Sequence, residues 1–248
     1  MNEKERKKLI NSYIGRTVDI KIDRPIGYIH HGNTYPVNYG YIPGVIGGDG
    51  EELDVYLLGV DKPVSEYRAK IIGAVHRIDD NEDKLVAAPE GAIFDQAQIA
   101  EQVAFQERYF TTSIEALHHR SCGAVIYRRR GDGIEYLCLF QRRSERYSFP
   151  KGHAEAYETE LETAEREIKE EIGICAELDS LFREKVHYSF NEIKRKTVVL
   201  FLAEYNGELN VDSGEISEYV WADIEKAKEL LPEWYEAVLE KADQYINR

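Results

Sequence analysis

The sequence predicts a two-domain α+β protein, in which a small β-barrel is followed by a domain that mixes strands with helices. The first 110 residues contain many short strand-like runs, separated by glycine and proline turns, and one helical run near their end. Near residues 113–118 the composition changes and a new strand-like run begins. A chain of 248 residues that is 43% hydrophobic can also build two cores. We therefore place the domains at residues 1–113 and 118–248.

The first domain is predicted from short alternating runs. Residues 1–12 indicate a short charged helix or arm, and residues 17–23 alternate polar and apolar side chains as a half-buried strand does. Strand-like runs follow at 69–77 and from Lys84 onward. Residues 95–110 have helical periodicity. Several short strands with one late helix are typical of a small β-barrel.

Two acidic segments interrupt these strands. Asp49, Glu51, Glu52 and Asp54 fall within six residues, where a loop enters a strand, and a second acidic turn contains Asp79, Asp80, Glu82 and Asp83. Carboxylates this close repel one another unless a cation lies between them. The first segment therefore predicts a site for a divalent metal ion.

The second domain begins with a predicted hairpin and contains an acidic helix. Strands at 121–130 and 134–142 flank a Gly-Asp-Gly turn, and helices close the domain between residues 223 and 247. Between them, Glu167, Glu170 and Glu171 stand at i, i+3 and i+4, so a helix gathers them within one arc. The apolar stripe beside this arc consists of Leu161, Ala164, Ile168 and Ile172.

A divalent cation would explain why three glutamates share one arc. Like charges at this spacing repel, and carboxylate oxygens are the ligands that Mg²⁺ or Mn²⁺ prefers. Arg166 reaches Glu170 at i+4 and can fix the orientation of that carboxylate. We therefore predict Mg²⁺ or Mn²⁺ as the cofactor.

The spacing around this helix resembles the Nudix box. Gly152 is followed by five residues and Glu158, then by seven residues and Arg166-Glu167-Ile168-Lys169-Glu170-Glu171-Ile172-Gly173-Ile174. The resemblance covers residues 117–248. It implies an α/β/α sandwich and a metal-dependent attack of water on a phosphorus atom of a nucleoside diphosphate derivative.

Further motifs resemble one branch of the Nudix hydrolases, the asymmetrical diadenosine tetraphosphate hydrolases. These motifs are Pro150-Lys151-Gly152-His153, the opening run 121–126, the strand 196–204, and Ser213-Gly214-Glu215 with Tyr219-Val220-Trp221. The resemblance implies that Glu167, Glu170, Glu171 and Gly152 hold the metal, that Arg166 orients the carboxylates, and that Glu170, Glu171 or Glu215 activates water. It also implies that Lys151 contacts a phosphate and that Tyr188 or Tyr219 stacks on an adenine.

The first domain resembles the family I soluble inorganic pyrophosphatases over residues 13–110. The resemblance lies in Tyr35-Pro36-Val37-Asn38-Tyr39-Gly40-Tyr41 and in Asp49-Gly50-Glu51-Glu52-Leu53-Asp54. It implies metal ligands at Asp49, Glu51, Asp54 and Asp79, and phosphate contacts from Lys84 and Tyr39.

This domain also departs from the pyrophosphatase pattern. Glu51 and Glu52 replace an aspartate and a proline, the segment after Arg24 and before Tyr35 has no lysine or arginine, and Phe110 stands where a lysine is expected. Pyrophosphate cleavage depends on positive charge that stabilises the transition state. The barrel is therefore either a pyrophosphatase or a module for binding or dimerisation.

The composition narrows the class of partner. A net charge of −14 argues against binding to nucleic-acid phosphates. The apolar runs are too short to cross a membrane, the N-terminus lacks a signal-peptide apolar region, and Cys122, Cys138 and Cys175 lack metal-ligand spacing. We expect a cytoplasmic enzyme with a small nucleotide substrate and no nucleic-acid or membrane partner; a homo-oligomer is left open. The alternative function is a nucleoside triphosphate pyrophosphohydrolase whose released pyrophosphate is cleaved by the first domain.

Overall fold

The computed structural model describes residues 1–30, 32–211 and 214–248, so Ser213 of the predicted substrate-site motif lies outside the described residues. The chain divides into two compact units. The first comprises Met1–His119 with Asn191–Lys194, and the second comprises Arg120–Phe190 with Arg195–Arg248.

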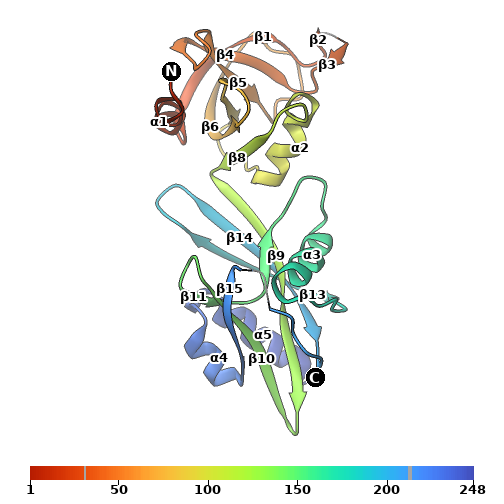
Figure 1. Ribbon diagram of the computed structural model, residues 1–248. Coiled ribbons are helices and arrows are strands. Elements are labelled where there is room, and N and C mark those ends of the chain that lie inside the picture. Colours follow the sequence, from red (N-terminus) through yellow and green to blue (C-terminus); the bar gives the residue numbers. More distant parts are fainter. Residues whose placement is uncertain (31, 212–213) are drawn as a thin grey trace. The chain divides into compact units, whose positions relative to one another are not determined.

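The first unit is a β-barrel (Figure 1). Its elements are α1 (Glu3–Tyr13), β1 (Thr17–Arg24), β2 (Ile29–His30), β3 (Asn33–Thr34), β4 (Asn38–Ile46), β5 (Glu52–Leu57), β6 (Glu66–Arg77), β7 (Lys84–Ala88), α2 (Gln96–Glu107) and β8 (Thr112–Ala116). The sheet has the order β1-β4-β5-β7-β6-β8, and an additional pairing of β1 with β6 closes it. The pairing of β5 with β7 is parallel, whereas the other barrel pairings are antiparallel.

Alternate side chains of the barrel strands enter two separate cores. Val55 packs in one cluster, together with Ile10 of α1, whereas its neighbour Tyr56 packs in the other, together with Ile99 of α2. This alternation follows from the two-residue period of a strand. It places the tyrosine-rich face of the barrel against α2.

The second unit is built around a mixed set of strands and helices. Its elements are β9 (His118–Arg130), β10 (Gly133–Gln141), β11 (Arg146–Ser148), β12 (Lys151–His153), α3 (Glu160–Ile172), β13 (Asp179–Ser189), β14 (Arg195–Glu204), β15 (Ile216–Ala222), α4 (Ile224–Leu230), η1 (Glu233–Tyr235) and α5 (Glu236–Ile246). The main path of its sheet is β11-β10-β9-β14-β13, with β12 paired to β9 and β15 paired to β10.

Helices cover this sheet from both sides, which makes an α/β/α sandwich. Ile168 and Ile172 of α3 pack on one face with Leu137 and Leu139, whereas Val238 of α5 belongs to the core on the other face. The predicted apolar stripe of α3 is confirmed: Ala164, Ile168 and Ile172 are buried, and Leu161 packs against the same cluster. The predicted fold class, a barrel followed by a Nudix-like sandwich, is confirmed.

Local signals define both ends of α3. Thr159 caps its N-terminus by accepting a hydrogen bond from the backbone N–H of Glu162, and the Glu162 side chain accepts from the Thr159 N–H, which completes a capping box. Gly173 ends the helix with φ 70°, a left-handed conformation that suits glycine. These caps fix α3 between Thr159 and Gly173.

Several short strands had no sequence signal strong enough to predict them. The β2–β3 hairpin has two residues per strand, and β11 and β12 have three each. Runs this short contain too few residues to show a periodic pattern. In the described parts of the chain, no helix combines the length and the apolar character needed to cross a membrane.

Candidate active site

Strand β12 lies close to the first carboxylate of the acidic arc. Pairing of Gly152 with Cys122 holds β12 on β9. A Cβ atom added at Gly152 would overlap the Glu167 carboxylate. Glycine at this position allows the backbone of β12 and the Glu167 carboxylate to lie in direct contact, and a larger residue would displace that carboxylate.

The three glutamates of the arc have different degrees of burial. Glu171 is 4% exposed, whereas the Glu170 side chain is 60% exposed. The Glu171 carboxylate accepts hydrogen bonds from the Lys151 backbone N–H at 2.8 Å and from Gln141 Nε2 at 3.0 Å. Burial raises the pKa of Glu171 to about 7 and also raises the pKa of Glu167. Positive charge at this site would relieve the cost of ionising them.

Arg166 connects the loop to the helix carboxylates. Its Nε and Nη2 donate to the two Glu158 oxygens at 2.6 and 2.9 Å, and Nη2 also donates to the His153 carbonyl at 2.9 Å. Nη1 donates to Glu167 at 2.7 Å and to Glu170 at 3.2 Å, so the predicted contact with Glu170 is confirmed. The bidentate pair with Arg166 lowers the pKa of Glu158 to about 2. Glu158 therefore orients Arg166, and Arg166 in turn orients the other carboxylates.

The residues of α3 fit a hard divalent cation in their chemistry. Three carboxylates share one arc, and the Gly152 backbone lies against one of them. In the described ranges, no three His, Cys, Asp or Glu side chains already form a metal-ligand arrangement. Glu167 and Glu170 instead share the Arg166 guanidinium.

Two lysines lie near this acidic site, and the sequence indicated only one of them. Lys151 begins β12 and is half-buried. Lys196 is 7% exposed on β14, and its Nζ lies 3.5 Å from Nε2 of His153. Burial lowers the pKa of Lys196 to about 7. The sequence places Lys196 at the end of the basic run Lys194-Arg195-Lys196, which does not indicate that this one side chain is buried beside the site.

An aromatic stack lies at the end of the same strand pair. Tyr188 of β13 is opposite Lys196 in the register of β13 and β14. Its ring stacks on Trp234, with 4.9 Å between centroids and 21° between planes, and the Arg146 guanidinium lies 5.9 Å from the Trp234 ring. A pocket of about 390 Å³ adjoins this stack. Its lining residues are Phe140, Glu145, Arg146, Tyr147, Leu230, Leu231, Pro232, Glu233 and Trp234.

The two remaining predicted residues of this unit lie on or next to β15. Glu215 is exposed immediately before β15, and its negative charge contributes to the raised pKa of Glu167. Tyr219 lies opposite Leu139 in the sheet and is 44% exposed. Tyr219 does not line the pocket beside Trp234.

In the barrel, three of the predicted polar residues, Asp54, Lys84 and Tyr39, meet at one point. Lys84 Nζ donates to Asp54 Oδ2 at 2.7 Å and to the Tyr39 hydroxyl at 2.5 Å, and it also pairs with Glu82. The Tyr39 hydroxyl in turn donates to Asp54. Burial raises the pKa of Glu82 to about 7.

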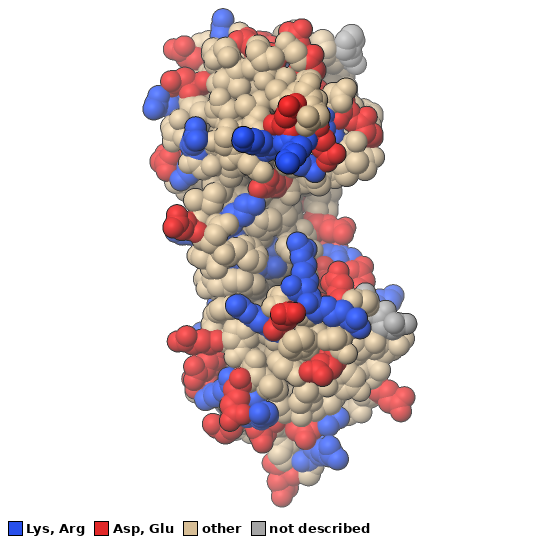
Figure 2. Space-filling model, turned by 60° about the vertical axis from the view of Figure 1, so that its left-hand side comes forward, with Lys and Arg blue, Asp and Glu red and all other residues tan. Residues whose placement is uncertain are grey.

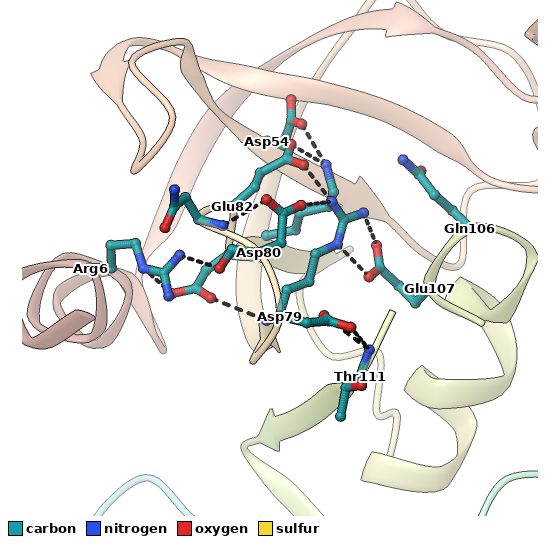
Figure 3. A network of polar contacts seen from close by, with 12 residues as sticks. Arg6, Asp54, Asp79, Asp80, Glu82, Gln106, Glu107 and Thr111 are labelled. Carbon is teal, nitrogen blue, oxygen red and sulfur yellow. Dashed lines mark hydrogen bonds and ion pairs between the residues drawn. The ribbon is translucent and has the colours of Figure 1, made fainter. Parts of the chain in front are cut away.

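The other predicted barrel ligands contact different partners. Asp49 accepts a hydrogen bond from the Glu51 backbone N–H at 3.0 Å, and both residues are exposed. Asp79 accepts from the Thr111 backbone N–H at 2.9 Å (Figure 3). The structure therefore brings Asp54, Lys84 and Tyr39 together but directs Asp49 and Asp79 elsewhere.

Known proteins resemble both halves of the chain. Residues 7–116 match the family model of inorganic pyrophosphatase, and residues 117–242 match that of the NUDIX domain. An inorganic pyrophosphatase of Neisseria meningitidis is 42% identical over 59 residues, which is 22% of this chain and 33% of that protein. The solved structure of a C. elegans Ap4A hydrolase binary complex shows 26% identity and a TM-score of 0.49, over 52% of this chain and 98% of that one.

The second half also matches a curated relative along nearly all of its length. An asymmetrical bis(5'-nucleosyl)-tetraphosphatase of Sus scrofa is 36% identical over 141 residues, which is 51% of this chain and 95% of that protein. Together with the NUDIX match over residues 117–242, this similarity confirms the predicted resemblance. The chain belongs to the Nudix family and is a Nudix hydrolase.

Proposed function

We propose that this chain hydrolyses dinucleoside polyphosphates, diadenosine tetraphosphate in particular, to ATP and AMP with the help of Mg²⁺ or Mn²⁺. The observation that carries the proposal is the register of β13 and β14, which sets the buried Lys196 opposite Tyr188. A cation for phosphate thus stands beside the Tyr188–Trp234 stack, which presents an aromatic face to a base, near the carboxylates of α3. The similarity to an asymmetrical bis(5'-nucleosyl)-tetraphosphatase supports the same substrate class.

In this proposal Glu167, Glu170 and Glu171 hold the metal ion, and the absence of a side chain at Gly152 lets the Glu167 carboxylate lie against the β12 backbone. When bound, the ion supplies positive charge that stabilises the charge developing on the phosphate oxygens. Arg166 keeps the Glu167 and Glu170 carboxylates in place through its two hydrogen bonds from Nη1.

A general base and two lysines complete the proposed site. One carboxylate among Glu170, Glu171 and Glu215 accepts a proton from the attacking water, as a general base does. Lys151 and Lys196 bind phosphate oxygens as point charges, since an ammonium group donates in three directions.

A base fits beside Trp234 rather than between Trp234 and Tyr188. These two rings are already in direct stacking contact, so they leave no space for a third ring between them. The pocket on the Arg146 side offers the indole face and a guanidinium to one adenine. Exposed Tyr219 is the candidate for stacking on the second adenine.

The product pattern tests this function. The full-length protein is incubated with diadenosine tetraphosphate and either Mg²⁺ or Mn²⁺, and the products are separated by anion-exchange chromatography. We expect ATP and AMP in equal amounts. Two ADP molecules, or no cleavage beside rapid turnover of nucleoside triphosphates, would overturn the proposal and favour the pyrophosphate-releasing alternative.

Lys196 provides a second, more specific test. Lys196→Met should raise the KM for diadenosine tetraphosphate about 10-fold or more, because a buried charge-assisted phosphate contact is lost. Lys194→Met, two residues earlier and in the turn before β14, is the matched control and should leave KM near the wild-type value. An unchanged KM in the folded Lys196 variant would remove this lysine from the site.

A further inference from the structure

Two buried cations lie within the polar network of the barrel. Lys84 is 1% exposed and Arg77 is 3% exposed. Lys84 pairs with Asp54 of β5 and with Glu82 of the 79–83 turn, whereas Arg77 pairs with Asp80 and Glu82 of that turn and with Glu107 of α2. These four carboxylates lie together in Figure 3. The contacts of Lys84 and Arg77 determine whether these cations are available to bind the phosphate oxygens of pyrophosphate.

Lys84 uses every hydrogen of its ammonium group inside the protein. An ammonium group has three N–H donors. The Lys84 donors go to Tyr39, Asp54 and Glu82. Lys84 therefore has no donor left for a phosphate oxygen while these contacts persist.

Arg77 also donates most of its N–H groups to carboxylates of the barrel. Its Nε and Nη2 form a fork on Glu107, both at 2.8 Å, and Nη1 donates to Asp80 at 3.1 Å and to Glu82 at 2.5 Å. Phe110 covers the guanidinium, with 3.6 Å between the Arg77 Cζ atom and the ring centroid. Phe110 thus occupies, against Arg77, the position where the pyrophosphatase pattern has a lysine.

The network also connects several elements of the barrel. The Tyr56 hydroxyl on β5 donates to Glu107 of α2 at 2.5 Å. Arg6 of α1 donates to the Asp80 carbonyl at 2.7 Å and pairs with Asp83 at 3.8 Å. The turn that bears the second acidic cluster is therefore tied to α1 on one side and to α2, through Arg77, on the other.

We propose that this network is a structural clamp and that the barrel does not hydrolyse pyrophosphate. Hydrolysis needs cations that can face the phosphate oxygens and carboxylates that converge on metal ions. Arg24 is also engaged, since it donates to the Tyr35 hydroxyl at 2.8 Å and lies over the Tyr39 ring. Asp49, Asp79 and Asp83 point to separate partners. The inference does not depend on the nucleotide substrate of the other unit.

Phosphate release from pyrophosphate tests the catalytic half of the proposal. The full-length protein is assayed with pyrophosphate and either Mg²⁺ or Mn²⁺, beside the variants Asp54→Asn and Asp49→Asn. Asp49 is exposed, so its variant keeps the fold even if loss of the Asp54 carboxylate weakens the network. We expect the same background rate in all three proteins. A wild-type rate 10-fold or more above either variant would overturn the proposal, because it would show a working carboxylate-metal centre.

Thermal unfolding tests the structural half. Arg77→Met should lower the Tm of the barrel transition by about 10 °C or more, because it leaves Glu107 buried without its partner. Arg68→Met is the control: Arg68 also pairs with a carboxylate, that of Asp19, but its side chain is 67% exposed. Equal Tm values for the two variants would show that Arg77 is not part of a clamp, and recovery of the lost Tm on adding pyrophosphate with Mg²⁺ would also overturn the proposal.

Discussion

Tyr157 has a backbone conformation that its side chain disfavours. Its φ is 68°, in the loop before α3, and the residue is 72% exposed. A non-glycine residue in the left-handed region costs about 1 kcal/mol. We expect Tyr157→Gly to raise the free energy of unfolding, measured in urea, by up to about 1 kcal/mol. Tyr157→Ala keeps the Cβ and should show no such gain, and a less stable glycine variant would indicate that the tyrosine side chain supports the loop.

The central prediction for catalysis concerns the side chains of Glu170 and Glu171. Replacing either with glutamine keeps the size of the side chain but removes its charge, so hydrolysis of diadenosine tetraphosphate should fall by about 10²-fold or more. Glu165→Gln is the matched control, because Glu165 is an exposed glutamate of the same helix. The measurement is kcat at saturating metal. Near-normal turnover in both variants would exclude this arc from the mechanism.

At the scale of single residues, sequence spacing predicted the groups that are close along the chain and missed those that meet through folding. Glu167, Glu170 and Glu171 follow from helical geometry alone. Gln141 and Lys196 do not, because Gln141 reaches Glu171 from the end of β10 and Lys196 reaches His153 from β14. Trp234 and Tyr188 are more than forty residues apart in the sequence, yet their rings are in contact. Such contacts depend on the sheet order, which no local pattern contains.

At the scale of elements, the loop and helix of the Nudix box behave as one unit because Arg166 joins them. The guanidinium contacts Glu158 and the His153 carbonyl in the loop, and Glu167 and Glu170 on α3. Its planar fork makes several directed contacts at once, which a lysine cannot reproduce. The sequence motif contains Glu158 but assigns it no role. The structure shows that Glu158 holds the Arg166 guanidinium.

Arg166→Lys tests this coupling. We expect the concentration of Mg²⁺ needed for half-maximal activity to rise by roughly 10- to 100-fold, because the lost contacts no longer orient the ligand carboxylates. Arg183→Lys is the control, since Arg183 makes a similar bidentate pair with Glu160 of α3, near the start of the helix. A variant that needs no more Mg²⁺ than wild type would indicate that Arg166 has only a structural role.

At the scale of the whole molecule, the sequence predicted two domains and the fold class of each. It did not predict which charged side chains pair with one another in the barrel. The acidic segments suggested metal sites because the sequence shows carboxylates without their partners. Folding places cations beside several of these carboxylates: Lys84 lies against Asp54, and Arg77 lies against Asp80 and Glu82. On the face visible in Figure 2, Lys and Arg side chains are interspersed with Asp and Glu despite the net charge of −14. Charge pairing of this kind makes stability depend on pH.

His76 provides the pH-dependent prediction. Its side chain is 13% exposed and lies 3.5 Å from Asp83 and 3.3 Å from Glu115. The Asp83 carboxylate, together with the hydrogen bond between His76 and Glu115, raises the pKa of His76 to about 9. Because this pKa is above that of an unfolded histidine, the protonated ring stabilises the folded state fully below about pH 6.5. That stabilisation should be lost as the pH rises through about 9.

Urea unfolding at pH 6.5 and pH 10 measures this contribution. Wild type should lose up to about 3 kcal/mol more than His76→Gln between these two values, since each pKa unit corresponds to about 1.4 kcal/mol. Other groups that titrate in this range affect both proteins equally, so the difference isolates His76. His187→Gln, an exposed histidine on β13, should keep the wild-type pH dependence. If His76→Gln instead lost as much stability as wild type, the contacts with Asp83 and Glu115 would not hold a proton on His76.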